Sequence, residues 1–363
     1  MSGMPASVRD LLVITPQVVA ALWALAGLAV LSALRLRRRH LAASLAGLLA
    51  LVLLPVAAGA AVNAHYQYLP RIADVVNVPT WPTASRAAVS VVAVRTRYPR
   101  GAVVTLPMAG RVSGFGTHDA LVYLPPQYFS EPTRRFPVIY LVHGSPGAPV
   151  DWFRAARAAD VGLTAARAGH PVLLVAPRAS RSWSDDSECV DRPHEHVETY
   201  LSVDVLRDTD AQLRTIADRW HRGLAGNSAG GFCALNVGLR HRREFSVVLD
   251  LSGYDHPTYD GGLARLFGSR HPVARAAADT PADYAGSLAP WPRMHVWLDY
   301  GRADRLPRAS RQGCSHRACQ PRFNGESMIW RKKPVRSGGD TCAVRAARYR
   351  PVMNRDSARS GCR

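Results

Sequence analysis

One serine, flanked by small residues at a defined spacing, is the feature of this sequence that most directly indicates chemistry. Residues 226–230 read G-N-S-A-G, a G-x-S-x-G segment that follows a short apolar stretch and precedes an alanine- and leucine-rich helical pattern at 232–237. In a strand–turn–helix context, small residues let the turn close tightly and expose the serine hydroxyl. The sequence therefore predicts Ser228 as the nucleophile of an acyl-transfer reaction. The alternative is a tight turn with a structural role alone.

An acyl-transfer serine needs hydrogen-bond donors for the oxyanion that develops on the attacked carbonyl group. An apolar strand pattern at 139–142 runs into a glycine-containing turn, His143-Gly144-Ser145. A backbone N–H from such an early strand–loop connection, together with the N–H of the residue after the nucleophile, commonly supplies these donors. We therefore predict the backbone N–H groups of Ser145 and Ala229 as oxyanion donors. We interpret His143 as a packed turn residue rather than the catalytic base.

Alternating strand and helix patterns surround these residues. Short β-branched or aliphatic runs predict strands at 102–106, 119–124, 137–142, 171–176, 246–251 and 294–299, with helices at 152–168, 199–219 and 229–241. Strands that alternate with helices of this length are typical of a mostly parallel α/β sheet. Residues 87–304 are therefore predicted to form one α/β domain, after a proline-containing linker at 63–86.

Two long uncharged segments open the chain. Residues 11–34 and 41–62 contain 24 and 22 residues without a charge, and an arginine-rich loop of six residues separates them. Each segment is long enough to cross the hydrocarbon core of a bilayer as a helix. Short basic loops stay in the cytoplasm, so residues 1–62 are predicted to form a two-pass membrane hairpin. The rest of the chain is then extracytoplasmic, where disulfides are permitted.

The net charge of +19 is unevenly distributed along the 363 residues. Residues 1–64 carry +4, residues 65–304 carry +3, and residues 305–363 carry +12. Because the middle of the chain is nearly neutral and shows no nucleic-acid-binding module, we expect no nucleic-acid partner. The sequence also lacks a CxxC pair and an HExxH motif, so we expect no metal or other cofactor.

Several segments occur in an order that resembles the putative-esterase family of α/β-hydrolases, which includes S-formylglutathione hydrolase and the secreted mycolyltransferases. The resemblance covers about residues 100–304 and implies an α/β-hydrolase fold. It also implies an acyl-enzyme on serine, with an ester or thioester as substrate and water or a sugar hydroxyl as acceptor. A membrane-anchored member would act on lipid, glycolipid or cell-envelope esters. The segments that carry the resemblance are VYLPP at 122–126, YLVHG at 140–144, DW at 151–152, ECVD at 188–191, TYLSVDV at 199–205 and GNSAGG at 226–231.

The acid and the base of a catalytic triad follow the serine in this fold. Asp304 lies just past the apolar run at 294–298, at a position that resembles the family's acid, and Asp299 is an alternative. An ordinary solvated loop acid is a further alternative for Asp304. His316 is the one histidine after Asp304, but it comes too early for another helix and strand, and its surroundings differ from the family pattern. The second hypothesis is therefore a catalytically impaired or inactive homologue that lacks the triad histidine.

The last segment, 305–363, changes character. It holds 13 arginines and four of the six cysteines, and it shows no amphipathic period or buried-strand run. One interpretation is a disordered basic appendage that binds anionic surfaces. The other is that translation has left the family's reading frame near 306–312, so that the final helix, strand and histidine are missing.

Two cysteines of the α/β domain are predicted to meet near the active site. Cys189 lies in the loop after the strand at 171–176, and Cys233 lies one turn past Ser228. Loops that follow parallel strands gather at one edge of the sheet, so we predict a Cys189–Cys233 disulfide, with two unpaired thiols as the alternative. The loop at 182–186, S-W-S-D-D, either lines an acceptor site with its indole and carboxylates or is simply solvated.

Overall fold

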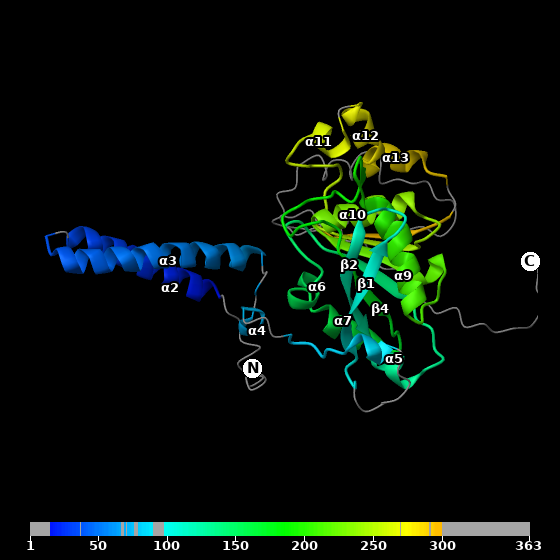
Figure 1. Ribbon diagram of the computed structural model, residues 1–363, viewed down its shortest axis with the longest axis horizontal. Coiled ribbons are helices and arrows are strands. Elements are labelled where there is room, and N and C mark those ends of the chain that lie inside the picture. The colour runs from blue at the N-terminus through cyan, green and yellow to red at the C-terminus, as the bar shows by residue number, and fades with distance from the viewer. Residues whose placement is uncertain are drawn as a thin grey trace, which may run out of the picture.

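The computed structural model describes residues 15–299, except for 37, 67–68, 70, 76–78, 90–97, 269 and 290–291. It shows an α/β domain and, before it in the chain, a hairpin of two long helices (Figure 1). Asp304 and His316 lie outside the described residues, as does the segment 305–363.

A seven-stranded sheet forms the centre of the domain, in the order β1-β2-β4-β3-β7-β8-β9. The strands β4, β3, β7, β8 and β9 run parallel, whereas β1 and β2 pair antiparallel at one edge. The mostly parallel α/β sheet predicted from the sequence is thereby confirmed. The strands are β1 (Ala102–Gly110), β2 (Gly116–Leu124), β3 (Val138–Val142), β4 (Leu173–Ala176), β7 (Arg222–Asn227), β8 (Val247–Leu251) and β9 (His295–Asp299), and a separate two-stranded hairpin consists of β5 (Asp191–Arg192) and β6 (Glu195–His196).

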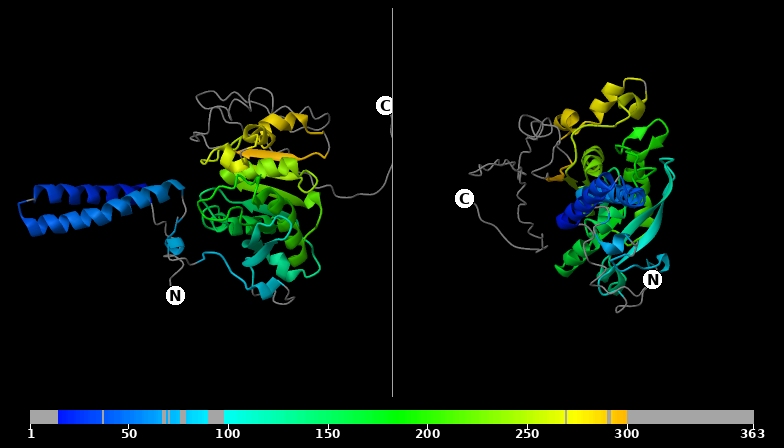
Figure 2. Two further views of the ribbon diagram at one scale, coloured as in Figure 1. Left: turned by 45° about the horizontal axis from the view of Figure 1, so that its top comes forward. Right: turned by 90° about the vertical axis from the view of Figure 1, so that its left-hand side faces the viewer.

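Helices pack on both faces of the sheet, as parallel strands buried on both faces require (Figures 1 and 2). One face packs against the helices α6 (Asp151–Arg154) and α7 (Ala158–Arg167), and the other against α9 (Val205–Gln212) and α10 (Ala229–Arg240). The remaining short helices are α5 (Pro126–Ser130), α8 (Val197–Thr199), α11 (Leu263–Phe267), α12 (Pro272–Ala278) and α13 (Pro281–Tyr284), with single turns at Arg86–Val89, Tyr200–Asp204, Arg219–His221 and Ala285–Ser287.

Two of the predicted helices differ in extent from those in the structure. The helix expected at 152–168 is divided into α6 and α7, because Arg157 adopts a left-handed backbone with φ 52°. The helix expected at 199–219 ends at Gln212. Beyond it the chain is extended, and Thr215 pairs with Phe136 as an isolated β-bridge. Pairing with a distant segment has overridden the local helical pattern there.

The N-terminal helices are α2 (Pro16–Arg35) and α3 (His40–Tyr66), followed by the short α4 (Ile72–Val75). Both long helices are long and apolar enough to cross a membrane. They pack against each other through small residues and expose large ones, as Ala26 and Ala57 are fully buried whereas Leu28 and Leu41 are 61% and 85% exposed. The hairpin projects away from the domain, as Figure 1 and the left view of Figure 2 show.

The segment between α4 and the sheet joins the domain before β1 begins. Thr83 forms a β-bridge with Val103 of β1. The N–H of Val103 donates to the carbonyl oxygen of Pro82 at 2.8 Å, and the N–H of Ala84 donates to the carbonyl oxygen of Val103 at 3.0 Å. The end of the predicted linker therefore lies along the outer edge of the sheet.

Candidate active site

Ser228 lies on a sharp turn between β7 and α10, at the carboxyl edge of the sheet. Its backbone has φ 56° and ψ −124°, a strained conformation for a residue with a side chain, and the residue is exposed. Its N–H donates to the carbonyl oxygen of Leu251 at 2.9 Å, which ties the turn to the end of β8. The strand–turn–helix context predicted for this serine is present, and the strained turn holds the residue out from the sheet edge.

The glycines around Ser228 are required by close packing. A Cβ on Gly226 would lie 1.6 Å from the carbonyl oxygen of Gly230, across the turn. A Cβ on Gly230 would lie 2.2 Å from the carbonyl oxygen of Val142, at the end of β3. A larger residue at either position would push α10 away from β3, so both glycines fix how the serine sits relative to the neighbouring strand.

The turn after β3 lies directly against the nucleophile. A Cβ on Gly144 would be 3.0 Å from the carbonyl oxygen of Asn227 and 3.3 Å from the Cβ of Ser228. Ser145 is the next residue, and Ala229 is the first residue of α10, whose N–H has no acceptor within its own helix. The structure therefore places Ala229 directly after Ser228, and places Ser145 in the turn whose Gly144 packs against Ser228. The N-terminus of α10 adds a favourable dipole for an anion there.

His143 has both ring nitrogens engaged by the backbone. Nδ1 lies 2.8 Å from the carbonyl oxygen of Gly144, and Nε2 lies 3.1 Å from the N–H of Ala179. This arrangement fits a neutral ring that donates from Nδ1 and accepts at Nε2. Burial lowers the pKa of His143 to about 4, which outweighs the opposing effect of the Gly144 carbonyl. His143 thus holds the turn in place and has no nitrogen free to accept a proton from Ser228.

The long loop after β4 borders the same turn. The N–H of Gly147 donates to the carbonyl oxygen of Trp183 at 2.8 Å, and the hydroxyl of Ser145 donates to the carbonyl oxygen of Asp185 at 3.3 Å. The Trp183 side chain is 52% exposed. The loop at 182–186, for which the sequence left an acceptor site and a solvated loop open, therefore lies beside the turn after β3, with an indole at the surface.

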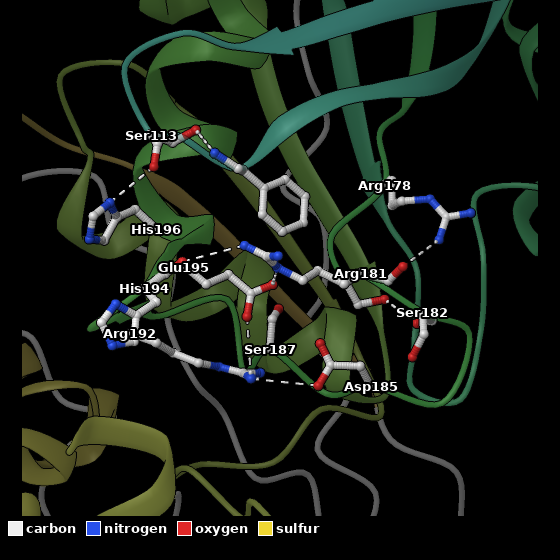
Figure 3. A network of polar contacts seen from close by, with 12 residues as sticks. Ser113, Arg178, Arg181, Ser182, Asp185, Ser187, Arg192, His194, Glu195 and His196 are labelled. Atoms are coloured by element: carbon white, nitrogen blue, oxygen red, sulfur yellow. Dashed lines mark hydrogen bonds and ion pairs between the residues drawn. The ribbon is translucent and has the colours of Figure 1, made fainter. Parts of the chain in front are cut away.

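A polar network stabilises this loop against the β5–β6 hairpin (Figure 3). The guanidinium of Arg192 lies 3.5 Å from the carboxylate of Asp185 and 3.4 Å from that of Glu195. Arg181 reaches the other side of Glu195, with its Nε 3.4 Å from Oε1. Figure 3 shows both arginines converging on Glu195. Because Arg192 and Glu195 are mostly buried, the loop has a defined shape where it meets the site.

Cys189 and Cys233 form a disulfide in the structure, with Cα atoms 5.3 Å apart and a sequence separation of 44. Both residues are buried, with Cys189 1% and Cys233 3% exposed. The bond connects the end of the β4 loop to the first turns of α10. The two segments that border Ser228 are therefore covalently joined.

A buried carboxyl group lies next to this disulfide. Glu188 is fully buried and accepts hydrogen bonds from the Tyr254 hydroxyl at 2.8 Å and from the N–H of Thr258 at 2.8 Å. The ring of Tyr254 stacks on that of Phe232 in α10, with centroids 4.9 Å apart. Burial, and then the nearby Asp186 carboxylate, raise the pKa of Glu188 to about 8. The β4 loop is thus attached to α10 through a carboxyl group whose pKa is raised well above its usual value.

We expect this group to make stability depend on pH. The pKa of Glu188 rises from 4.5 in the unfolded chain to about 8 in the folded one, so its contribution is fully present below 4.5 and is lost as the pH rises through 8. The free energy of unfolding should therefore fall between pH 5 and pH 9. Glu188→Gln keeps a carbonyl oxygen as the acceptor but cannot lose a proton. The free energy of unfolding of this variant should therefore change less with pH and should exceed that of the wild type at pH 9. Urea unfolding at several pH values measures the free energy of unfolding of each variant, and Glu131→Gln on the surface is the control. An unchanged pH profile in Glu188→Gln would contradict the assignment.

The predicted acid and base are not among the described residues, since Asp304 and His316 both follow residue 299. Asp299, the alternative acid, is the last residue of β9, and its carbonyl oxygen accepts a hydrogen bond from the N–H of Ser252 at 2.7 Å. The structure also shows a pair that the sequence analysis did not single out. His256 Nδ1 lies 2.6 Å from the carboxylate of Asp255, in the loop after β8, and the histidine is partly exposed. Its signal in the sequence is only an adjacent Asp-His after a predicted strand.

Solved structures share this fold. An S-formylglutathione hydrolase from Agrobacterium tumefaciens matches 62% of this chain and 84% of its own with a TM-score of 0.51 and 15% sequence identity. The fluorophosphonate-binding serine hydrolase FphF of Staphylococcus aureus matches 59% of this chain and 85% of its own, with a TM-score of 0.50 and 16% identity. The sheet order, the serine turn and these likenesses define an α/β-hydrolase.

The sequence profile of the Putative esterase family matches residues 117–332, more than half of the chain, and the chain belongs to that family. An uncharacterized protein of Corynebacterium glutamicum is 33% identical over 208 residues, which are 55% of this chain and 49% of that protein. An esterase of Mycobacterium tuberculosis is 26% identical over 194 residues, which are 48% of this chain and 41% of the esterase. The chain thus spans about half the length of the curated relatives it matches. The family and the fold inferred from the sequence motifs are confirmed.

Proposed function

We propose that this protein is a membrane-anchored serine esterase or acyltransferase that forms an acyl-enzyme on Ser228. The observation that carries the proposal is the packing of the Gly144–Ser145 turn against an exposed serine in a strained turn at the start of α10. This geometry supports a nucleophile with two backbone N–H groups beside it. Membership of an esterase family supports an ester or thioester substrate.

The reaction follows from these positions. The Ser228 oxygen attacks the acyl carbon and its proton passes to a general base, for which a histidine is the family's residue, while the N–H groups of Ser145 and Ala229 stabilise the oxyanion. The intermediate collapses, and the alcohol or thiol leaves with that proton. Water or an acceptor hydroxyl then attacks the acyl-serine and regenerates the free enzyme. Asp304 is the proposed acid that orients the histidine, with Asp299 as the alternative.

The N-terminal hairpin supports an anchored enzyme. Its buried positions are alanines and its exposed positions include Leu28, Leu41 and Leu51, which is the arrangement expected of helices surrounded by lipid. We propose residues 1–62 as the anchor, 63–86 as the linker, 87–304 as a C-terminally incomplete hydrolase domain and 305–363 as a basic, cysteine-containing tail that is either disordered or out of the family's reading frame. With the basic loop in the cytoplasm, the domain faces outward, toward lipid, glycolipid or cell-envelope esters.

A second candidate is a homologue that binds acyl esters with little or no turnover. His143 is committed to the backbone, and within the described ranges no histidine nitrogen is hydrogen-bonded to the Ser228 hydroxyl. A triad without its base loses several orders of magnitude in rate. This candidate keeps the oxyanion turn and the neighbouring loop as a binding site.

One experiment tests the nucleophile and the topology together. Cells that express the full chain are treated with a fluorophosphonate probe that does not cross the cytoplasmic membrane. One sample has its outer envelope layers removed and its cytoplasmic membrane intact, and the other sample is lysed. Labelling in both samples is the expected result. Labelling after lysis alone would keep Ser228 as a nucleophile but reverse the topology. A chain that is unlabelled in both samples would contradict an activated serine and favour the second candidate.

A further inference from the structure

A cavity of about 660 Å³ lies at the opposite edge of the sheet from Ser228. All of its lining residues belong to segments that immediately precede the parallel strands β7, β8 and β9, and the amino ends of those strands meet there. The cavity is therefore separate from the candidate active site, which lies at the carboxyl ends. Its lining consists of Arg219, Arg240, His241, Arg242, Arg243, Glu244, Ala289 and Pro292.

Part of this positive charge is balanced by carboxylates. Arg240 lies 2.8 Å from Glu198 and 3.3 Å from Asp279, and His241 shares the same Glu198 oxygen at 2.8 Å. Glu244, the one acid in the lining, lies 3.3 Å from the guanidinium of Arg222. The carboxylates of Glu198, Asp279 and Glu244 are therefore already paired, and they do not neutralise the other arginines of the lining.

Three arginines of the lining have no such partner. In the part of the chain that the structure describes, no carboxylate lies within ion-pair distance of Arg219, Arg242 or Arg243. Arg242 donates to the carbonyl oxygen of Ala289 at 2.6 Å. These three arginines line one cavity from two different segments, and an anion bound there would offset the repulsion between their like charges.

Arg219 lines this cavity and is fixed in place by backbone acceptors and by the Trp220 ring, whose centroid lies 4.2 Å from the guanidinium carbon. Its guanidinium donates to the carbonyl oxygens of Arg242 at 2.8 Å, Phe245 at 3.2 Å and Arg293 at 2.6 Å. Its remaining nitrogen, Nη1, is buried and has no hydrogen-bond partner among the described residues. Burial and the nearby charge of Arg242 lower the pKa of Arg219. A buried donor without an acceptor is destabilising unless a ligand supplies one.

We infer that this cavity binds the phosphate group of an anionic ligand. A phosphate presents several oxygens in a tetrahedral arrangement, so it can accept from guanidinium groups that approach from different segments, whereas a carboxylate offers two oxygens in one plane. The volume exceeds what a phosphate group alone would fill, so there is room for the group that carries it. The same chemistry is found in a free phosphate ester and in the headgroup of an anionic phospholipid. The site is independent of the function proposed for Ser228.

The test uses the full chain in detergent and isothermal titration with two soluble probes. Inorganic phosphate represents a free phosphate, and glycerophosphoglycerol represents a phospholipid headgroup without its acyl chains. Binding of either probe is expected, and the tighter of the two identifies the source. Arg243→Gln removes a charge that makes no described contact with the rest of the chain, and it should weaken binding about tenfold, as loss of one charge-assisted contact does. The double variant Arg242→Gln/Arg243→Gln should abolish binding.

Arg207→Gln provides the matched control, because Arg207 is exposed on α9, which packs near β1, and lies outside the cavity. It should bind the probe as the wild type does, and thermal unfolding of each variant verifies that it is folded. The inference is overturned if neither probe binds at millimolar concentration. It is also overturned if folded Arg243→Gln and the folded double variant bind as tightly as the Arg207→Gln control.

Discussion

Replacing Ser228 with alanine should lower the rate of ester hydrolysis by at least about a thousandfold, because the nucleophile of an acyl-enzyme has no substitute. The residual rate would come from the oxyanion donors and from binding, which the change leaves in place. The measurement is hydrolysis of a p-nitrophenyl ester by the purified full chain, together with intact mass after a rapid acid quench. The wild type should gain the mass of one acyl group, and Ser228→Ala should gain none.

The control for this prediction is Ser130→Ala, at the end of α5 and away from the carboxyl edge. It should hydrolyse the ester at the wild-type rate. His256→Gln, measured in parallel, shows whether the Asp255–His256 pair serves as the base, since loss of turnover with an intact Ser228 would assign it that role. If Ser228→Ala and the wild type hydrolyse the ester equally fast, the proposed nucleophile is wrong.

Removal of the Cys189–Cys233 disulfide should lower the free energy of unfolding by about 4 kcal/mol, as expected for a loop of this length from chain entropy. The reason is that the bond restricts the unfolded chain across 44 residues. Activity should fall as well, because the same bond attaches the loop beside Ser145 to the helix that begins after Ser228. Urea unfolding of the double variant Cys189→Ala/Cys233→Ala against the wild type gives the difference.

Adding a reductant distinguishes the contribution of the disulfide bond to stability from that of the packing of the two side chains. The wild type with reductant should approach the stability of the double variant, whereas reductant should leave the double variant unchanged. The four remaining cysteines lie beyond residue 299, so this second comparison also reveals any contribution from them. Equal stability of the wild type with and without reductant would argue against the bond.

The elements around Ser228 could be predicted because their signals are local. An apolar run followed by G-N-S-A-G is compatible with few conformations. Gly226 and Gly230 allow backbone segments to approach so closely that a Cβ at either position would clash. The pairing of Cys189 with Cys233 could be predicted from topology, because loops after parallel strands meet at one edge. The neutral, structural role of His143 was likewise anticipated from its place in the chain.

What the sequence did not indicate depends on contacts between distant segments. The helical pattern at 199–219 stops at Gln212 because Thr215 pairs with Phe136, about 80 residues away. The raised pKa of Glu188 arises from burial beneath Tyr254, which no local pattern encodes. The arginine cavity is formed by segments up to about 70 residues apart in sequence. The net charge of a long stretch of chain therefore does not reveal that these arginines lie together.

The strand-like contact of residues 82–84 with Val103 has a consequence if residues 1–62 anchor the protein in a bilayer, as proposed above. Anchored copies diffuse in two dimensions and collide more often than free ones, and an exposed edge strand is a template for pairing between copies. The outer backbone groups of Val103 are already occupied by the chain's own preceding segment. In an anchored protein, residues 82–84 would also protect this part of β1 from pairing with another copy.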